Sequence, residues 1–246
     1  MNLDKLLRTL SNKNRRMILK TINDNPSTFT EIKNRLNLSS PSLARHITRL
    51  HAAELIEKNQ TEQYLTSSLG ILVLKSLVGL EFTAKHAKYI QEHDVSPIPD
   101  QLASSLWMLK ETVQVSPTYR IIELLDQKTA GNIDFYYDLS DDFPEFMIDR
   151  VESKILEGTE FKAVYPENVL RAKIGNLPSL VMENIEFRVM DEVRLTVVVS
   201  DSFAFLGLPT GGYVDRNTYL YGEDKWFRDW YMKLFEYYWL KSRQYG

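Results

Sequence analysis

Residues 28–66 read TFTEIKNRLNLSSPSLARHITRLHAAELIEKNQTEQYLT, and this stretch decides the fold of the N-terminal part of the chain. Its apolar residues form two groups at helical spacing, Ile32 and Leu36, then Leu43, Ile47 and Leu50. Apolar residues at i, i+4 and i+7 share one face of a helix. We therefore predict two short helices that each bury one stripe in a small common core.

Polar residues mark where these helices begin. Thr28 and Glu31 have the spacing of a capping box, which predicts the start of the first helix. The break Asn37–Ser40 separates the two helices. Ser40 offers an N-cap hydroxyl, and Pro41 follows at the helical position where a missing N–H costs nothing. The second helix is expected to start near Pro41.

After Leu50 the pattern changes to the period of two that is typical of strands. Leu55–Lys58 and Tyr64–Thr66 are predicted strands, and the polar residues 59–63 join them. This hairpin is the expected wing of a winged helix.

The polar positions of the second helix must face outward if its leucines and isoleucine face inward. Side chains of these types contact phosphates and base edges in DNA. The predicted DNA-binding residues are Ser40, Ser42, Arg45, His46 and Arg49 of the helix, Lys58 and Gln60 of the wing, and Lys13 and Arg15 upstream. For the upstream pair, an ordinary solvated charge cluster is the alternative.

Residues 38–56, LSSPSLARHITRLHAAELI, resemble the winged helix-turn-helix regulators of the arsenical-repressor kind. The resemblance implies a DNA-binding domain. It departs at Glu54, where such proteins usually have a glycine before the Leu-Ile pair. A helix-turn-helix that contacts only protein is the alternative, because a motif match needs structural context.

Charge divides the chain into two parts. Residues 1–66 hold 11 Lys/Arg and 6 Asp/Glu, a net charge of +5, which leaves 19 against 27, or −8, for residues 67–246. Only the first part can attract a polyanion such as double-stranded DNA. The chain has no cysteine and no apolar run of the roughly 20 residues needed to span a bilayer. We also expect no leader, because no charged-then-apolar segment opens the sequence. We expect a cytoplasmic protein that does not contact a membrane.

The predicted domains are a winged helix over residues 1–66, a connecting helix over 67–93 and an α/β effector or assembly domain over 94–246. Upstream leucines and the run Met17–Ile22 predict two further helices beneath the helix-turn-helix. In the connecting helix, a 4-3-4-3 spacing indicates a coiled-coil seam. Its residues are Val73, Leu77, Leu80, Ala84 and Ala87. A homodimer is therefore expected, and packing of this helix on its own domain is the alternative.

After the two-proline segment 94–100, strand and helix patterns alternate, which favours an α/β layer with some parallel pairing. Expected helices cover 102–112, 118–125, 143–156, 167–172 and 223–242. Expected strands cover 133–137, 160–165, 185–190, 194–200 and 203–208. We expect the last three strands to form an antiparallel meander, and the aromatic final helix to be buried on much of its circumference.

From His93 onward the chain resembles the effector domain named for the methanogenesis regulatory protein, found in archaeal winged-helix regulators. The matching motifs are His93-Asp94-x-x-x-Ile98-Pro99, Phe205-Leu206-Gly207-Leu208, Gly212-Tyr213-x-Asp215 and Trp230 with Leu234-Phe235-x-Tyr237-Tyr238. The resemblance implies transcriptional control, and a domain similar to the phospholipase-D-like sensor domains of archaeal sugar regulators.

All four histidines precede residue 94, so the second domain lacks the commonest general base and the softer metal ligands. We expect no catalytic residue, cofactor or metal ion. One candidate metal site for Mg²⁺ or Ca²⁺ consists of four carboxylates, those of Asp134, Asp138, Asp141 and Asp142. The favoured alternative is that these residues cap the helix expected at Phe143. Tyr213, Trp226 and Trp230 are the predicted contacts of a small-molecule effector, with a turn and plain core as the alternatives.

The sequence thus predicts an α+β winged helix-turn-helix followed by an α/β domain. The predicted function is a dimeric, sequence-specific regulator of transcription that binds double-stranded DNA. Two other functions stay open. One is a carboxylate-dependent phosphodiesterase with an appended winged helix, and the other is a non-enzymatic protein-assembly module.

Overall fold

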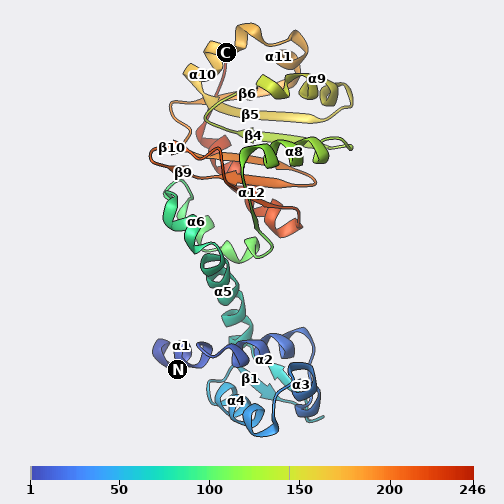
Figure 1. Ribbon diagram of the computed structural model, residues 1–246, viewed down its shortest axis with the longest axis vertical. Coiled ribbons are helices and arrows are strands. Elements are labelled where there is room, and N and C mark those ends of the chain that lie inside the picture. Colours follow the sequence, from blue (N-terminus) through green and yellow to red (C-terminus); the bar gives the residue numbers. More distant parts are fainter. Residues whose placement is uncertain (1, 144) are drawn as a thin grey trace. The chain divides into compact units, whose positions relative to one another are not determined.

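The computed structural model describes residues 2–143 and 145–246 (Figure 1). The chain divides into two compact units, residues 1–78 and 79–246, and the division falls inside helix α5 (Ser68–Lys85). Each unit has a hydrophobic core of its own.

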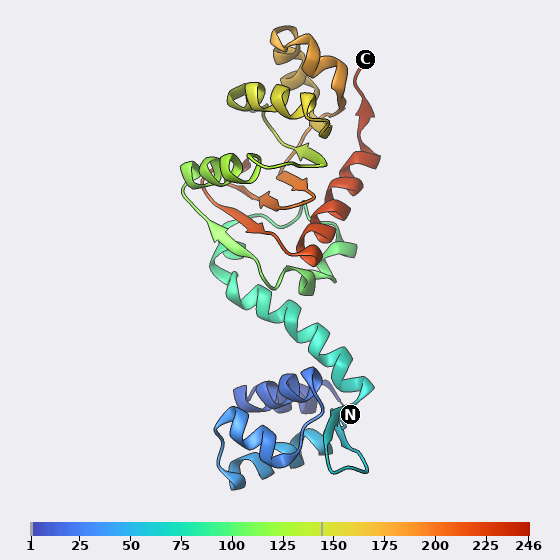
Figure 2. The ribbon, with the colours of Figure 1, turned by 90° about the vertical axis from the view of Figure 1, so that its right-hand side faces the viewer.

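The N-terminal unit is a winged helix-turn-helix, as predicted. Its elements are α1 (Leu3–Leu10), α2 (Lys13–Asp24), α3 (Phe29–Leu36), α4 (Ser40–Ala52), β1 (Ile56–Lys58), β2 (Tyr64–Thr66) and the first part of α5. The two strands pair antiparallel, with Ile56 opposite Thr66. Figure 2 shows α2, α3 and α4 gathered into one bundle beside this hairpin.

The capping box predicted for α3 is confirmed, but the predicted cap of α4 is wrong by one residue. Thr28 and Glu31 each bond the other's backbone N–H. The N-cap of α4 is Ser39, whose hydroxyl accepts the Ser42 N–H. Asn37 ends α3 with a left-handed φ of 49°, so the chain has turned far enough for Ser39 to be extended and for Ser40 to be helical already.

Glu54 occupies the left-handed position that ends α4. Its φ is +58°, its N–H bonds the His51 carbonyl, and the N–H of Leu55 bonds the Leu50 carbonyl. This pair of bonds is the Schellman motif, whose left-handed residue is usually glycine. The glutamate therefore keeps the turn of the regulators that the sequence resembles, at a conformational cost that glycine would avoid.

The connecting helix is not continuous, contrary to prediction. Helix α5 ends at Lys85, and α6 (Ala87–Glu92) begins after His86. The predicted coiled-coil seam is also wrong. Val73 and Leu77 are buried in the core of the N-terminal unit, whereas Leu80 and Ala84 are exposed. The seam residues therefore do not form one free face.

Gly70 explains which face of α5 turns inward. A Cβ at this position would lie 2.2 Å from the Leu55 carbonyl oxygen, so only glycine lets α5 approach the start of the wing so closely. That approach directs Val73 and Leu77 into the core and leaves Leu69 and Leu72 in solvent.

The C-terminal unit contains an eight-stranded mixed sheet in the order β12-β6-β5-β4-β7-β8-β11-β3. The strands are β3 (Val113–Val115), β4 (Phe135–Leu139), β5 (Glu160–Pro166), β6 (Ile185–Met190), β7 (Thr196–Ser200), β8 (Ala204–Gly207), β11 (Tyr219–Gly222) and β12 (Arg243–Gln244). Strands β4, β5 and β6 are parallel, and all other pairs are antiparallel. A separate hairpin joins β9 (Pro209–Thr210) to β10 (Tyr213–Val214).

Helices cover both faces of this sheet. They are α7 (Asp100–Ala103), η1 (Leu106–Leu109), α8 (Thr118–Lys128), η2 (Glu145–Met147), α9 (Ile148–Leu156), α10 (Glu167–Lys173), η3 (Ile174–Asn176), α11 (Ser179–Asn184) and α12 (Lys225–Lys241). The two views show α8 and α9 on one face and α12 on the other (Figures 1 and 2). The expected α/β layer is confirmed.

Three expectations for this unit are wrong in detail. Residues 102–112 form the end of a short helix and a 3-10 turn rather than one helix, and the Leu102 carbonyl accepts from the Ser105 N–H and the Trp230 indole. The helix expected from residue 143 begins at Ile148. Strand β6 pairs in parallel with β5, so the antiparallel meander is β7-β8-β11 rather than β6-β7-β8.

The alternation of β4 places one carboxylate inside the unit. Tyr136 packs with the α8 side of the sheet and Leu139 with the α12 side. Asp138 has the same parity as Tyr136 and therefore lies on the α8 side, where it is buried.

Replacement of Glu54 by glycine should stabilise the N-terminal unit. Glycine adopts a positive φ without the Cβ clash that glutamate incurs, so we expect urea unfolding to show a gain of about 0.5–1 kcal/mol. Glu54→Ala is the matched control, since it removes the charge but keeps the Cβ. A gain of equal size in Glu54→Ala would assign the effect to charge and contradict the conformational account.

Candidate nucleic-acid interface

The outer surface of α4 carries two arginines that have no acidic partner. Leu43, Ile47 and Leu50 are buried, which leaves Arg45 and Arg49 exposed on the opposite side. Within residues 2–143 and 145–246, no ion pair involves either arginine. An unpaired guanidinium presents a rigid fork of donors that fits phosphate oxygens or the acceptor edge of guanine.

His46 lies among the arginines rather than beyond them. Its Nε2 is 3.4 Å from the Ser42 hydroxyl oxygen, and its buried Nδ1 has no hydrogen-bond partner. Burial, followed by the positive charges of Arg15, Arg45 and Arg49, lowers the pKa of His46. The imidazole is therefore neutral at pH 7, and the three guanidiniums surrounding it make a local excess of positive charge.

Arg15 has a structural task that the sequence did not indicate. Its guanidinium donates to the carbonyls of Arg8, at 2.7 Å, and Thr9, while Arg16 donates to the Leu10 carbonyl at 2.6 Å. These bonds satisfy the last carbonyls of α1, as basic side chains at helix C-termini do. Arg15 still adds charge beside His46, and Lys13 is exposed at the start of α2.

The wing is held rigid at its tip. The Asn59 side-chain oxygen accepts from the N–H groups of Thr61 and Gln63, at 3.0 and 2.9 Å. Lys58 pairs with Glu62 and lies 5.7 Å from the Tyr64 ring centroid, so its charge is partly neutralised. Gln60 is exposed at the tip and is the better placed of the two predicted wing contacts.

The two serines of the predicted set lie at the N-terminal end of α4. Ser40 is exposed in its first turn, and Ser42 is half-buried with its hydroxyl beside His46. The structure thus brings Ser42, Arg45, His46 and Arg49 together on one surface.

The predicted effector residues of the C-terminal unit do not share a site. Trp230 is wholly buried in the core under α12, and Tyr213 is 81% exposed on the β9–β10 hairpin. Trp226 is exposed and contacts Trp107 at a ring-centroid distance of 5.6 Å. The buried stripe of α12 is therefore core, as the alternative reading expected, and contact of an effector with Tyr213 and Trp226 stays a prediction.

The prediction for the four aspartates at residues 134–142 also needs correction. In the described part of the chain, no set of acidic and histidine side chains is arranged to hold a metal ion. Asp138 does not cap a helix, because it lies inside β4 and accepts the Tyr165 hydroxyl at 2.6 Å. The sequence analysis did not predict this buried pair. The alternation along β4 was a signal for it, because Asp138 falls on the same side of the strand as Tyr136.

None of the helices described in the structure is both long and apolar enough to cross a membrane.

Comparison with family models identifies both units. Residues 10–59 match a helix-turn-helix domain, and residues 120–241 match the middle domain of the methanogenesis regulatory protein FilR1. The chain is a helix-turn-helix regulator with a FilR1-type middle domain. This composition is that of a DNA-binding transcription regulator, and the two resemblances seen in the sequence are confirmed.

Two solved structures are similar to this FilR1-type regulator at low identity. TrmBL2, an archaeal chromatin protein described as showing a novel mode of DNA binding, is 14% identical, with a TM-score of 0.46 over 99% of this chain and 100% of that one. Nuc, a phospholipase D family member from Salmonella typhimurium, is 15% identical, with a TM-score of 0.41 over 55% of this chain and 99% of that one. Both TM-scores are too low to inform function. No curated protein sequence matches the chain.

Arg45→Ala should weaken binding of the regulator to its preferred duplex by about 1–3 kcal/mol while changing its affinity for random duplex much less, because a base-edge contact discriminates between sequences. Lys13→Ala is the control for a phosphate contact and should weaken both complexes alike. Fluorescence anisotropy with the two duplexes measures the difference. Equal losses for Arg45→Ala would place Arg45 on the backbone of the DNA.

Proposed function

We propose that the regulator binds a two-fold symmetric site on double-stranded DNA as a homodimer and reads each half-site with α4. The observation that carries the proposal is the pair of exposed, unpaired arginines on α4, beside a neutral His46. Arg45 and Arg49 lie four residues apart, one helical turn, so both can enter the same stretch of major groove. The rigid wing and Lys13 would contact the flanking phosphates.

Charge supports the same orientation. The winged helix, residues 1–66, has a net charge of +5 from 11 basic and 6 acidic residues, whereas the rest of the chain has −8 from 19 and 27. Repulsion of DNA by the acidic part favours approach through the winged helix. An acidic C-terminal domain is suited to sensing or assembly rather than to DNA contact, and we assign it that role.

The homodimer is proposed from exposed leucines in the N-terminal unit. On α5, Leu72 is 63% exposed and Leu69 is 36% exposed, three residues away on the same side. On α1, Leu3 and Leu7 are exposed one turn apart. Exposed apolar rows on helices are typical of a protein interface. A second copy of the chain is the partner that a two-fold DNA site requires. In this proposal the exposed leucines of α5 and α1 form the dimer interface, in place of the coiled-coil seam predicted through Val73 and Leu77.

The double variant Leu69→Glu, Leu72→Glu should be folded and monomeric at concentrations where the natural chain is a dimer. In a two-fold interface the added carboxylates would face like charges, whereas on a solvated surface they cost little. The monomer should keep its affinity for a half-site and lose at least tenfold for the full site, because the two half-sites no longer share one association cost. Sedimentation velocity and titration of both duplexes measure this.

The matching control is Leu69→Lys, Leu72→Lys. Each charged variant alone should be monomeric, and their mixture should recover the dimer through pairs of opposite charge. A Glu variant that stays dimeric would reject this interface. A mixture that stays monomeric would show that these leucines do not face their symmetry mates.

A further inference from the structure

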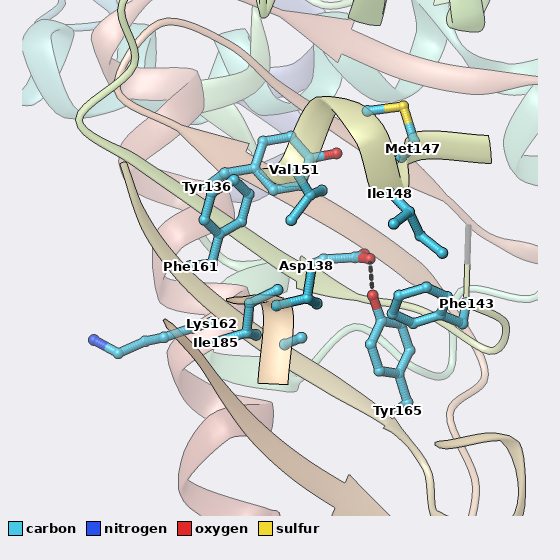
Figure 3. Close-up of a pocket in the computed structure, with 12 residues that line it drawn as sticks. Tyr136, Asp138, Phe143, Met147, Ile148, Val151, Phe161, Lys162, Tyr165 and Ile185 are labelled. Carbon is cyan, nitrogen blue, oxygen red and sulfur yellow. Dashed lines mark hydrogen bonds between the residues drawn. The ribbon is translucent and has the colours of Figure 1, made fainter. Parts of the chain in front are cut away.

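A cavity of about 170 Å³ lies in the C-terminal unit between α8, η2 and strands β4 and β7, and a smaller one of about 40 Å³ adjoins it near α9 and β5. The two share part of their walls, namely Tyr136, Asp138, Phe143 and Met147. Figure 3 shows the smaller cavity, with the Asp138 carboxylate directed at the Tyr165 hydroxyl. No residue of the proposed DNA interface lines either cavity, so DNA binding assigns them no role.

One atom in the cavity wall lacks the partner that it requires. Asp138 is 6% exposed, and its Oδ2 accepts the Tyr165 hydroxyl at 2.6 Å. Its Oδ1 is buried and accepts no hydrogen bond from the residues that the structure describes. Buried carboxylate oxygens without donors are costly and uncommon in folded proteins, so an outside donor is indicated.

The charges around the cavity favour a cation. Asp138, Asp141 and Asp142 contribute three carboxylates, and among the described residues Arg216 is the one basic residue lining the larger cavity. Arg216 is already shared by Asp142 and Asp141, at 2.9 and 3.2 Å. Lys162 points away from Asp138 (Figure 3) and pairs with Glu160 at 2.7 Å. The buried carboxylate is therefore not neutralised by any of these side chains.

Apart from these charged groups and the hydroxyl side chains of Thr118, Ser140 and Thr196, the walls are apolar and aromatic. They include Phe143, Phe205 and Tyr219, whose ring faces attract ammonium groups. A volume of about 170 Å³ is close to that of the engineered cavity of about 150 Å³ that holds benzene, so the ligand body has about six non-hydrogen atoms.

We propose that this cavity binds a small primary alkylammonium ion, whose N–H groups donate to Asp138 Oδ1 and whose alkyl chain fills the aromatic part. A bare divalent cation would need several oxygen ligands, and the described residues offer no such cluster. A neutral alcohol would satisfy Oδ1 but would leave the carboxylate charge uncompensated. This proposal is independent of DNA binding.

Pentylamine is the probe, titrated calorimetrically into the full chain at pH 8 without DNA. A ligand of this size is expected to bind with a Kd of about 0.1–5 mM, given ordinary affinities per atom. Pentan-1-ol tests the need for charge, and trimethylpentylammonium tests the need for an N–H donor. Both should bind at least tenfold more weakly. Equal binding of pentan-1-ol, or no binding of pentylamine, would overturn the proposal.

Asp138→Asn should reduce pentylamine affinity about 30-fold or more, as expected when one partner of a buried charge pair is removed. The variant should remain folded and melt at a higher temperature than the natural chain at pH 8, because it no longer buries an uncompensated carboxylate. Asp134→Asn, an exposed change just before the same strand, is the matched control and should bind normally. Retained affinity in a folded Asp138→Asn would overturn the proposal.

The pH dependence of binding gives a separate test. Burial, opposed by the Tyr165 hydroxyl and aided by Asp141, raises the pKa of Asp138 to about 7. The groups that face Asp138 are Tyr136 beside it on β4, Tyr165 on β5, Tyr219 on β11, and Arg216 with Asp141 and Asp142. In the part of the chain that the structure describes, no histidine lines either cavity. Burial also raises the pKa values of the three tyrosines.

The ammonium ion requires ionised Asp138, so binding below that pKa must expel a proton. Alkylamines stay protonated up to about pH 10, and pentylamine affinity should therefore fall about 25-fold from pH 7.5 to 5.5. The residual binding of Asp138→Asn should not follow this profile. A flat profile in the natural chain would show that Asp138 is not the group that holds the amine.

Discussion

The burial of one stripe of α4 is the constraint on which the DNA-binding surface depends. Leu43, Ile47 and Leu50 occupy the centre of the small N-terminal core, and each is buried by more than nine-tenths. Since the helix period fixes where the other side chains point, Arg45 and Arg49 cannot avoid solvent. The free energy that folds the unit thus also orients its cations.

Electrostatics then separates residues that the sequence treats alike. Four of the arginines near the helix-turn-helix show this. Arg15 and Arg16 bond the last carbonyls of α1, whereas Arg45 and Arg49 form no ion pair with the described residues. The unpaired side chains can exchange water for phosphate or base acceptors without first breaking a protein contact. This difference, rather than the number of basic residues, defines the interface.

Periodicity predicted the helix-turn-helix and the wing because their apolar residues recur at a fixed spacing. Burial of the final helix was predicted from aromatic residues on much of its circumference, and Trp226 and Leu240 on it are nevertheless exposed. Periodicity failed for α5, whose sequence SLGILVLKSLVGLEFTAK is apolar on most sides. The buried face is chosen there by Gly70 against the Leu55 carbonyl, a contact between segments that no local pattern contains. The role of Asp138 was also mispredicted, and for a similar reason. Whether a carboxylate after a strand caps a helix or enters a cavity depends on the neighbouring strand that supplies Tyr165.

The two units also differ in how their polar groups are used. In the winged helix the unpaired cations Arg45 and Arg49 are exposed and suit a large, strongly charged polymer. In the C-terminal unit one of several unsatisfied buried atoms is an oxygen of the Asp138 carboxylate, which lies in a cavity wall and suits a small ligand. In both units the proposed ligand is one that would supply the partner that the fold does not provide.

If α4 and its neighbours contact the DNA backbone and bases, the affinity of the chain for duplex DNA must depend steeply on salt concentration. With two or three phosphates contacted per subunit, a plot of log affinity against log salt concentration should have a slope of about −4 to −5. An affinity for duplex DNA that is independent of salt, or no affinity at low salt, would contradict the account and favour a helix-turn-helix that contacts protein.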